Sequence, residues 1–170
     1  MEAHASARLI AAALTERRQT VAAVEASAGG RLSTALTGIP GSSAWFLGAV
    51  IVYSAAAKEV LLGITAADLA ISGAVDASAA LVLARAARQR FGATWAVAET
   101  GVAGPLGGHR SRKPPGLAYV AVVGPTGEEV REVQTGRDDR QANQQTFAAS
   151  ALSLLAKQLD RGVEWVAPKG

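Results

Sequence analysis

Cysteine is absent from the 170 residues of the chain. Disulfide bonds and metal sites with cysteine ligands are therefore excluded. Imidazole is nearly as scarce, because His4 and His109 are the two histidines and no metal-type spacing relates them. The sequence therefore predicts no metal site.

Aromatic residues make up 5% of the chain and charged residues 18%, with a formal net charge of +3. Lysine and arginine are spread along the chain, and their densest cluster is 109–113, His-Arg-Ser-Arg-Lys. A mildly basic chain with so few aromatic side chains does not make a nucleic-acid platform, so we expect no nucleic-acid partner. The cluster itself is either a solvated loop or a contact for a ligand that carries phosphate.

Long uncharged apolar runs are also missing. Charged residues interrupt every apolar stretch before it reaches the length of a transmembrane helix. The first residues, 1–4, lack the basic and then apolar pattern of a signal peptide. We therefore expect a soluble, cytoplasmic protein with no membrane partner.

What the sequence does contain is an alternation of helical and strand-like segments, with one hairpin turn at 124–127. This alternation predicts an α/β fold of three layers, α/β/α, around a mixed and mostly parallel sheet. The continuous apolar run 48–53 predicts a strand covered on both faces. We expect one domain over residues 1–160 and an irregular tail over 161–170, whose Trp165 favours a homo-oligomer. The predicted helices are 5–17, 30–37, 58–62, 77–91 and 138–159, and the predicted strands are 20–24, 48–53, 94–98, 117–123 and 129–134.

Small residues and two glycines follow the first predicted strand. The segment 25–30, Glu-Ala-Ser-Ala-Gly-Gly, joins this strand to the next helix. A turn of this kind places backbone N–H groups at the C-terminal edge of a sheet, where they suit an anion such as phosphate. Plain turn chemistry is the alternative explanation of the paired glycines.

A second glycine-rich segment, 100–105 (Thr-Gly-Val-Ala-Gly-Pro), follows strand 94–98 within a long loop that we expect over 99–113. Two such segments at neighbouring strand ends would form the walls of one crevice. Tyr53 and Lys58 follow another strand and could lean over the same crevice, where partial burial would fit the lysine for general-base catalysis. A surface lysine at a helix start, with a tyrosine that caps the core, is the alternative.

Taken together, these segments resemble the C-terminal domain family of the competence/damage-inducible protein CinA, which includes stand-alone nicotinamide-nucleotide amidases. The resemblance covers nearly the whole chain, from the first predicted helix to the last. It rests on motifs in the family's order: Glu25 with Gly29-Gly30, Thr37, 40–44 (Pro-Gly-Ser-Ser-Ala), Tyr53-Ser54 with Lys58, Leu62-Gly63, 73–75 (Gly-Ala-Val), Thr100-Gly101, 103–105 (Ala-Gly-Pro), Gly107-Gly108, Lys113-Pro114 with Gly116, and Asp139-Arg140.

The resemblance implies hydrolysis of nicotinamide mononucleotide to nicotinic acid mononucleotide and ammonia, with a nicotinamide-type nucleotide as ligand and neither metal nor other cofactor. It also implies a serine nucleophile, a lysine base, and backbone N–H groups at the helix start that stabilise the oxyanion. Lys58 would be the base, and Tyr53 would position it or assist proton transfer. The residues that would bind the nucleotide are Glu25, Gly29, Gly30, Thr100, Gly101 and Gly104.

The chain departs from the family pattern where the nucleophile is expected. The family usually reads Glu-Ser-Cys-Thr-Gly-Gly, so Ala26 stands in the place of the serine, Ser27 in that of the cysteine and Ala28 in that of the threonine. Neighbouring side chains of an extended segment point to opposite sides, so Ser27 cannot take over the role without a backbone change. Three further positions of the pattern are altered, at Ala55, Asp76 and Leu106.

Two hypotheses therefore stay open. The first is a weakened or altered amidase, in which Ser27, or a water activated by Lys58, attacks the amide. The second is a catalytically inactive relative that acts as a nucleotide- or protein-binding module. The retained Lys58, Tyr53 and glycine-rich segments favour the first, and the joint loss of polar groups at Ala26, Ala28 and Leu106 favours the second.

Overall fold

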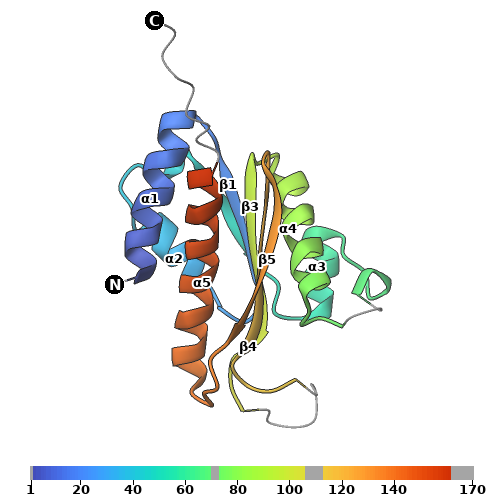
Figure 1. The fold of residues 1–170 in the computed structure, drawn as a ribbon. Helices are drawn as coiled ribbons and strands as arrows, with labels where there is room; N and C mark the ends of the chain where they lie inside the picture. The colour runs from blue at the N-terminus through green and yellow to red at the C-terminus, as the bar shows by residue number, and fades with distance from the viewer. Residues whose placement is uncertain (1, 70–72, 106–112, 162–170) are drawn as a thin grey trace, which may run out of the picture.

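The computed structural model of the chain describes residues 2–69, 73–105 and 113–161 (Figure 1). Leu106, most of the basic cluster 109–113, and Trp165 lie outside these ranges, so the predictions made for them stay predictions. None of the described helices is both long and apolar enough to cross a lipid bilayer. The helices are α1 (Glu2–Arg17), α2 (Arg31–Thr37), α3 (Ala55–Leu62), α4 (Ala77–Phe91) and α5 (Arg140–Arg161), and the strands are β1 (Val21–Glu25), β2 (Phe46–Ile51), β3 (Trp95–Val102), β4 (Leu117–Gly124) and β5 (Gly127–Gln134).

The described strands form a sheet in the order β2-β1-β3-β4-β5. Strand β1 is parallel to both β2 and β3, whereas β4 is antiparallel to both β3 and β5. The turn between β4 and β5 is the predicted hairpin, and Gly124 pairs with Gly127 across it. All residues of β1 are buried, as expected for a central parallel strand covered by helices.

Helices α1, α2 and α5 cover one face of the sheet, and α3 and α4 cover the other (Figure 1). On the first face, Leu14 and Leu155 belong to a buried cluster with Val97 of β3. On the second face, Leu83 belongs to a separate cluster with Val24 of β1. Burial of one such side chain stabilises the fold by about 1.5–3 kcal/mol. The predicted three-layer α/β/α fold with a mixed sheet is therefore confirmed.

The ends of α3 and α4 are fixed by local capping contacts. Asp76 Oδ1 accepts a hydrogen bond from the N–H of Ser78 at 2.9 Å, and Gly92 ends α4 with a left-handed φ of 60°. The sequence predicts both ends of α4, at Asp76 and at Gly92. A side-chain cap such as that of Asp76 contributes about 1 kcal/mol to the stability of the fold. In the same way, Ser54 caps the start of α3, where its Oγ accepts from the N–H of Ala57 at 3.1 Å. These caps fix where α3 and α4 begin.

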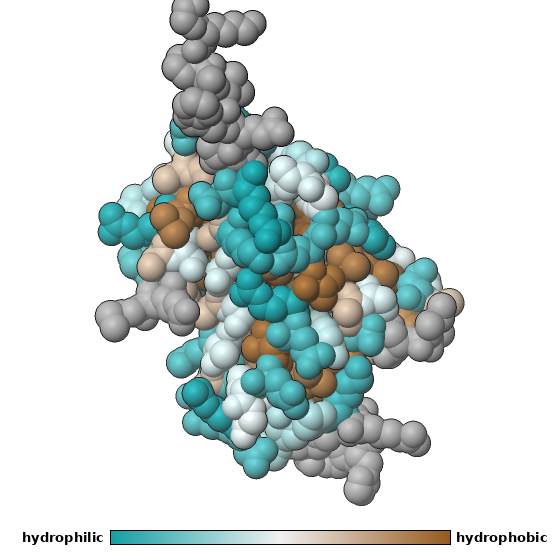
Figure 2. All heavy atoms as spheres, viewed as in Figure 1, coloured by the Kyte–Doolittle hydropathy of each residue, from teal (hydrophilic) through white to brown (hydrophobic). Residues whose placement is uncertain are grey.

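The two edge strands differ in character. The prediction that strand 48–53 is covered on both faces is wrong, because β2, which lies at an edge, has no fully buried residue and its Ile51 is 48% exposed. The opposite edge strand, β5, carries charged side chains, and the spheres over it in Figure 2 are mainly hydrophilic. Its Glu129 forms an ion pair with Lys157 of α5 at 2.9 Å. Charged side chains of this kind discourage pairing with a foreign strand.

Strand β3 extends beyond the predicted strand 94–98. Its pairing with β4 continues as far as Val102. The long loop that was expected to begin at Glu99 therefore begins after Val102, and Thr100 and Gly101 are strand residues. Glycine and charged residues are uncommon in strands, but the antiparallel neighbour supplies the hydrogen bonds that keep this segment extended.

Candidate active site

The bends that follow β1 and β3 lie at the same end of the sheet, because these strands are parallel neighbours. Side-chain amides from the first turns of α5 bind both bends. Gln144 Nε2 donates a hydrogen bond to the carbonyl oxygen of Ser27 at 2.8 Å, and Asn143 Nδ2 donates to that of Ala103 at 2.7 Å. The structure thus brings together the two glycine-rich segments, and α5 fixes their separation.

The carboxylate of Glu25 closes the N-terminal end of α2. Its Oε2 accepts from the backbone N–H groups of Gly30 at 2.7 Å and Leu32 at 3.1 Å. Its Oε1 accepts from the N–H of Ser33 at 2.9 Å and from the hydroxyl of Ser33 at 2.5 Å. Glu25 is fully buried, so it supports the bend from the interior. The resemblance assigns amides of this kind, at the start of a helix, to the oxyanion. Here the side chain of Glu25 occupies them.

A second buried carboxylate, that of Glu99 in β3, binds the bend after β1. Its Oε2 accepts from the backbone N–H groups of Ala26, Ser27 and Ala28, at 3.3, 3.0 and 2.8 Å. The hydroxyl of Ser27 donates to Oε1 of the same carboxylate. The one hydroxyl of this bend is therefore used to hold Glu99.

Ala26 and Ser27 face different layers of the molecule. Ala26 belongs to the buried cluster with Val52, on the side of α3 and α4. Lys58 reaches the same layer from α3, where it is 6% exposed and its Nζ donates to the carbonyl oxygen of Val52 at 3.2 Å. A polar side chain at position 26 would therefore share its layer with the lysine, whereas Ser27 binds Glu99 instead.

The carboxylate of Glu99 acts electrostatically on the amine of Lys58. Burial lowers the pKa of Lys58, and the negative charge of Glu99 opposes part of this effect. Burial raises the pKa of Glu99, while hydrogen bonds from the Ser27 hydroxyl and from the bend amides act in the opposite direction. A buried lysine with a lowered pKa loses its proton more readily and is suited to act as a general base.

Tyr53 and two arginines line the exposed rim of this region. Tyr53 is 67% exposed, and its hydroxyl accepts from Nη2 of Arg140 at 2.7 Å. On the bend itself, Nη1 of Arg31 donates to the carbonyl oxygen of Ala28 at 3.0 Å. Guanidinium groups are the side chains best suited to bind phosphate or carboxylate. The rim therefore presents positive charge to a ligand.

The glycines predicted to bind the nucleotide are required for two different reasons. Gly29 and Gly30 form the bend, since their φ angles of 66° and 95° are left-handed. A Cβ at Gly104 would lie 2.7 Å from the Cβ of Arg140, and one at Gly101 would lie 2.6 Å from a side chain of β4. Close packing on α5 thus explains Gly104, and close packing on β4 explains Gly101.

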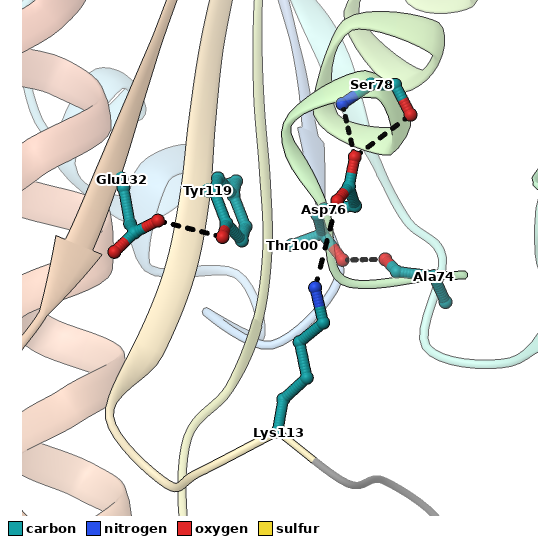
Figure 3. A network of polar contacts seen from close by, with 7 residues as sticks. All are labelled: Ala74, Asp76, Ser78, Thr100, Lys113, Tyr119 and Glu132. Atoms are coloured by element: carbon teal, nitrogen blue, oxygen red, sulfur yellow. Dashed lines mark hydrogen bonds and ion pairs between the residues drawn. The ribbon is translucent and has the colours of Figure 1, made fainter. Parts of the chain in front are cut away.

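Thr100 and Lys113 belong to a polar network at the start of α4 (Figure 3). The hydroxyl of Thr100 donates to the carbonyl oxygen of Ala74 at 2.6 Å, and Nζ of Lys113 lies 3.8 Å from Oδ2 of Asp76. The same Nζ lies 5.4 Å from the ring centroid of Tyr119. Thr100 is buried, so its hydroxyl holds the segment before α4 against β3.

Glu99 and Asn143 belong to the site, although the sequence alone does not assign them to it. The signal for Glu99 is an acidic residue directly after the apolar strand 94–98, where the sequence predicts the start of a loop. Asn143 carried no signal, because polar residues of an amphipathic helix usually face solvent. Within the described ranges, no group of three or more histidine or acidic side chains is arranged to hold a metal ion.

Comparison with known proteins places this arrangement in a family. The sequence profile of the CinA C-terminal domain matches residues 3–159. A CinA-like protein from Synechococcus is 47% identical over 121 residues, which cover 71% of this chain and 28% of the relative. Another, from Parasynechococcus marenigrum, is 43% identical over 154 residues, which cover 90% of this chain and 36% of the relative. The chain thus spans roughly a third of the length of these curated relatives.

Solved structures show the same fold. The crystal structure of the competence/damage inducible protein CihA from Agrobacterium tumefaciens has a TM-score of 0.86 and 34% sequence identity, over 94% of this chain and 96% of that chain. A CinA superfamily protein from Klebsiella pneumoniae has a TM-score of 0.85 and 26% identity, over 94% of this chain and 98% of that chain. The sheet, its helices and their connections are therefore those of these proteins.

Proposed function

Because the chain belongs to the CinA C-terminal domain family, we propose that it binds a nicotinamide-type nucleotide beside the bends after β1 and β3 and hydrolyses its amide slowly. The observation that supports this proposal most directly is the position of Lys58. Its amine is buried on the same layer as position 26, where the resemblance expects the nucleophile. The exposed rim, with Tyr53 and Arg140, supplies hydrogen-bond donors for a phosphate-bearing ligand.

In the proposed reaction, a water molecule takes the place of the missing serine hydroxyl. The neutral amine of Lys58 accepts a proton from this water, and the water oxygen attacks the amide carbon. Lys58 then returns the proton to the departing nitrogen, so ammonia leaves and a carboxylic acid remains. Burial supports this role, since it lowers the pKa of Lys58. The rate is slow because removal of an enzymatic nucleophile typically costs several orders of magnitude.

A binding module without turnover is the second candidate. One specific observation favours it: the Ser27 hydroxyl donates to Glu99, which also occupies the backbone amides of the bend. In this case Lys58 and the arginines of the rim, Arg31 and Arg140, would bind a nucleotide or a partner protein without catalysing a reaction.

The two candidates are separated by measuring binding and turnover together. Calorimetric titration of the wild-type protein with nicotinamide mononucleotide is expected to show saturable binding. Long incubation is expected to release ammonia at a rate that Lys58→Met abolishes. Lys157→Met, on the exposed side of α5, is the matched control and should leave the rate unchanged. Binding without ammonia release supports the second candidate, and absence of both contradicts the proposal.

A further inference from the structure

The amides closest to position 26 are already bound to an anion. Ser27 and Ala28 direct their N–H groups at one carboxylate oxygen of Glu99, at 3.0 and 2.8 Å. The N–H of Ala26 is shared between that oxygen at 3.3 Å and the main-chain carbonyl oxygen of Glu99 at 3.1 Å. Glu99 is fully buried. This contact joins residues 73 positions apart, so it is a feature of the folded site and not of a local turn.

These amides are also the ones nearest along the chain to a nucleophile at position 26. When an acyl intermediate forms on a side chain, the backbone N–H of the same residue and those of its neighbours lie near the carbonyl oxygen that becomes negatively charged. An N–H group that already donates to a carboxylate is poorly available to an oxyanion. Two negative charges at one cluster of donors would in addition repel each other.

We propose that Glu99 blocks oxyanion stabilisation in this chain, because its carboxylate occupies the amides of Ser27 and Ala28. The inference rests on the proposed function and deepens it. It identifies a second cause of slow hydrolysis that is independent of the missing hydroxyl at Ala26. It follows that the hydroxyl alone does not restore the activity, and that the bend must also be freed from Glu99.

The first test combines two substitutions. In Ala26→Ser, the new hydroxyl oxygen attacks the amide carbon and its proton passes to Lys58, which returns it to the nitrogen as ammonia leaves. Water then hydrolyses the resulting ester, which gives the carboxylic acid and regenerates the hydroxyl. We expect Ala26→Ser alone to release ammonia from nicotinamide mononucleotide at about the wild-type rate. Ala26→Ser with Glu99→Ala should exceed it by about tenfold or more, since a single oxyanion donor is worth about 10²–10³-fold.

Glu99→Gln provides the matched control. Its side-chain oxygen can still accept from the amides of Ser27 and Ala28, so Ala26→Ser with Glu99→Gln should stay close to Ala26→Ser alone. Circular dichroism and thermal melting establish that each variant is folded. If Glu99→Ala does not fold, Glu99→Thr takes its place, because threonine suits a strand and its shorter side chain also removes the carboxylate from these two amides. A folded double variant that is no faster than Ala26→Ser overturns the inference.

A second readout does not depend on nicotinamide mononucleotide at all. Inorganic phosphate is titrated into the isotopically labelled protein, and the NMR signals of the amides of Ser27 and Ala28 are followed. We expect saturable shifts in Glu99→Ala and no specific shifts in the wild type or in Glu99→Gln. Equal shifts in the wild type overturn the inference. If the phosphate result holds and the wild type neither binds nor hydrolyses the nucleotide, the proposed function fails and the role of Glu99 stands.

Discussion

Glu25 and Glu99 are register partners in the parallel pairing of β1 with β3, and both side chains are fully buried. Each carboxylate binds a different group of backbone N–H donors within residues 26–33. The protein therefore supplies its own anions at the place where an anionic ligand or intermediate would otherwise be stabilised. Four predictions follow from this arrangement and from the contacts around it.

Glu25→Ala should lower the free energy of unfolding by about 2–4 kcal/mol, because hydrogen bonds to a buried charged group and the cap of α2 are lost together. Urea denaturation followed by circular dichroism measures this loss. Glu59→Ala, at an exposed position of α3, is the matched control and should leave the stability close to that of the wild type. Similar losses in both variants would contradict the capping role of Glu25.

Glu99 should make the stability of the protein depend on pH in a defined direction. Burial raises its pKa, so between the ordinary and the raised pKa the folded state binds more protons than the unfolded state. Its contribution to stability therefore falls as the pH rises through this window. Glu99→Gln does not titrate, so its stability relative to the wild type should increase as the pH rises above the ordinary pKa of a glutamate. Urea denaturation at a series of pH values measures the difference, and a decrease with pH would show that the hydrogen bonds outweigh burial.

Asn143→Ala should lower the free energy of unfolding by about 1–3 kcal/mol, because it removes the donor to the carbonyl oxygens of Ala103 and Arg137. Hydrogen exchange measured by mass spectrometry should become faster in the bend after β3. Gln145→Ala, at an exposed position of the same helix, is the control and should leave the exchange unchanged. Unchanged exchange in Asn143→Ala would mean that this side chain does not fix the bend.

Tyr53→Phe should weaken the binding of nicotinamide mononucleotide and leave stability nearly unchanged. The hydroxyl is exposed, and Arg140 donates to it at 2.7 Å on the rim of the site. The loss of one such contact is expected to raise Kd by about twofold to tenfold, measured by calorimetry. Tyr119→Phe is the matched control, because it removes a hydroxyl on β4 that is bound to Glu132 of β5. An equal change in Kd for both variants would exclude a specific role of Tyr53.

The fold was predictable from the sequence where local signals determine the structure. Asp76 and Gly92 mark the ends of α4 because capping depends on a few neighbouring residues, and the hairpin between β4 and β5 follows from its turn residues. The edge position of β2 was not predictable, because strand order depends on which segments pair in space. The length of β3 was missed for a similar reason, since its last residues depend on their partner β4.

The site was predictable to a smaller extent. Lys58 was identified from its place after a strand, and the structure shows its amine buried. The partner of the Ser27 hydroxyl was not predictable, because Glu99 reaches it from a distant strand. Gly101 and Gly104 were assigned to a ligand, but nothing in a glycine-rich motif distinguishes ligand contact from close packing on β4 or on α5.

The distance along the chain between β1 and β3 has a consequence for folding kinetics. The segment between them contains β2, α3 and α4, so β1 cannot pair with β3 until a long loop has closed. Closure of such a loop has an entropic cost and slows folding. The carboxylate of Glu99 therefore cannot meet its amides until this loop has closed. A nascent chain that ends before residue 95 has the glycine bend but not the strand that holds it, so the site is completed only when both parts have been synthesised.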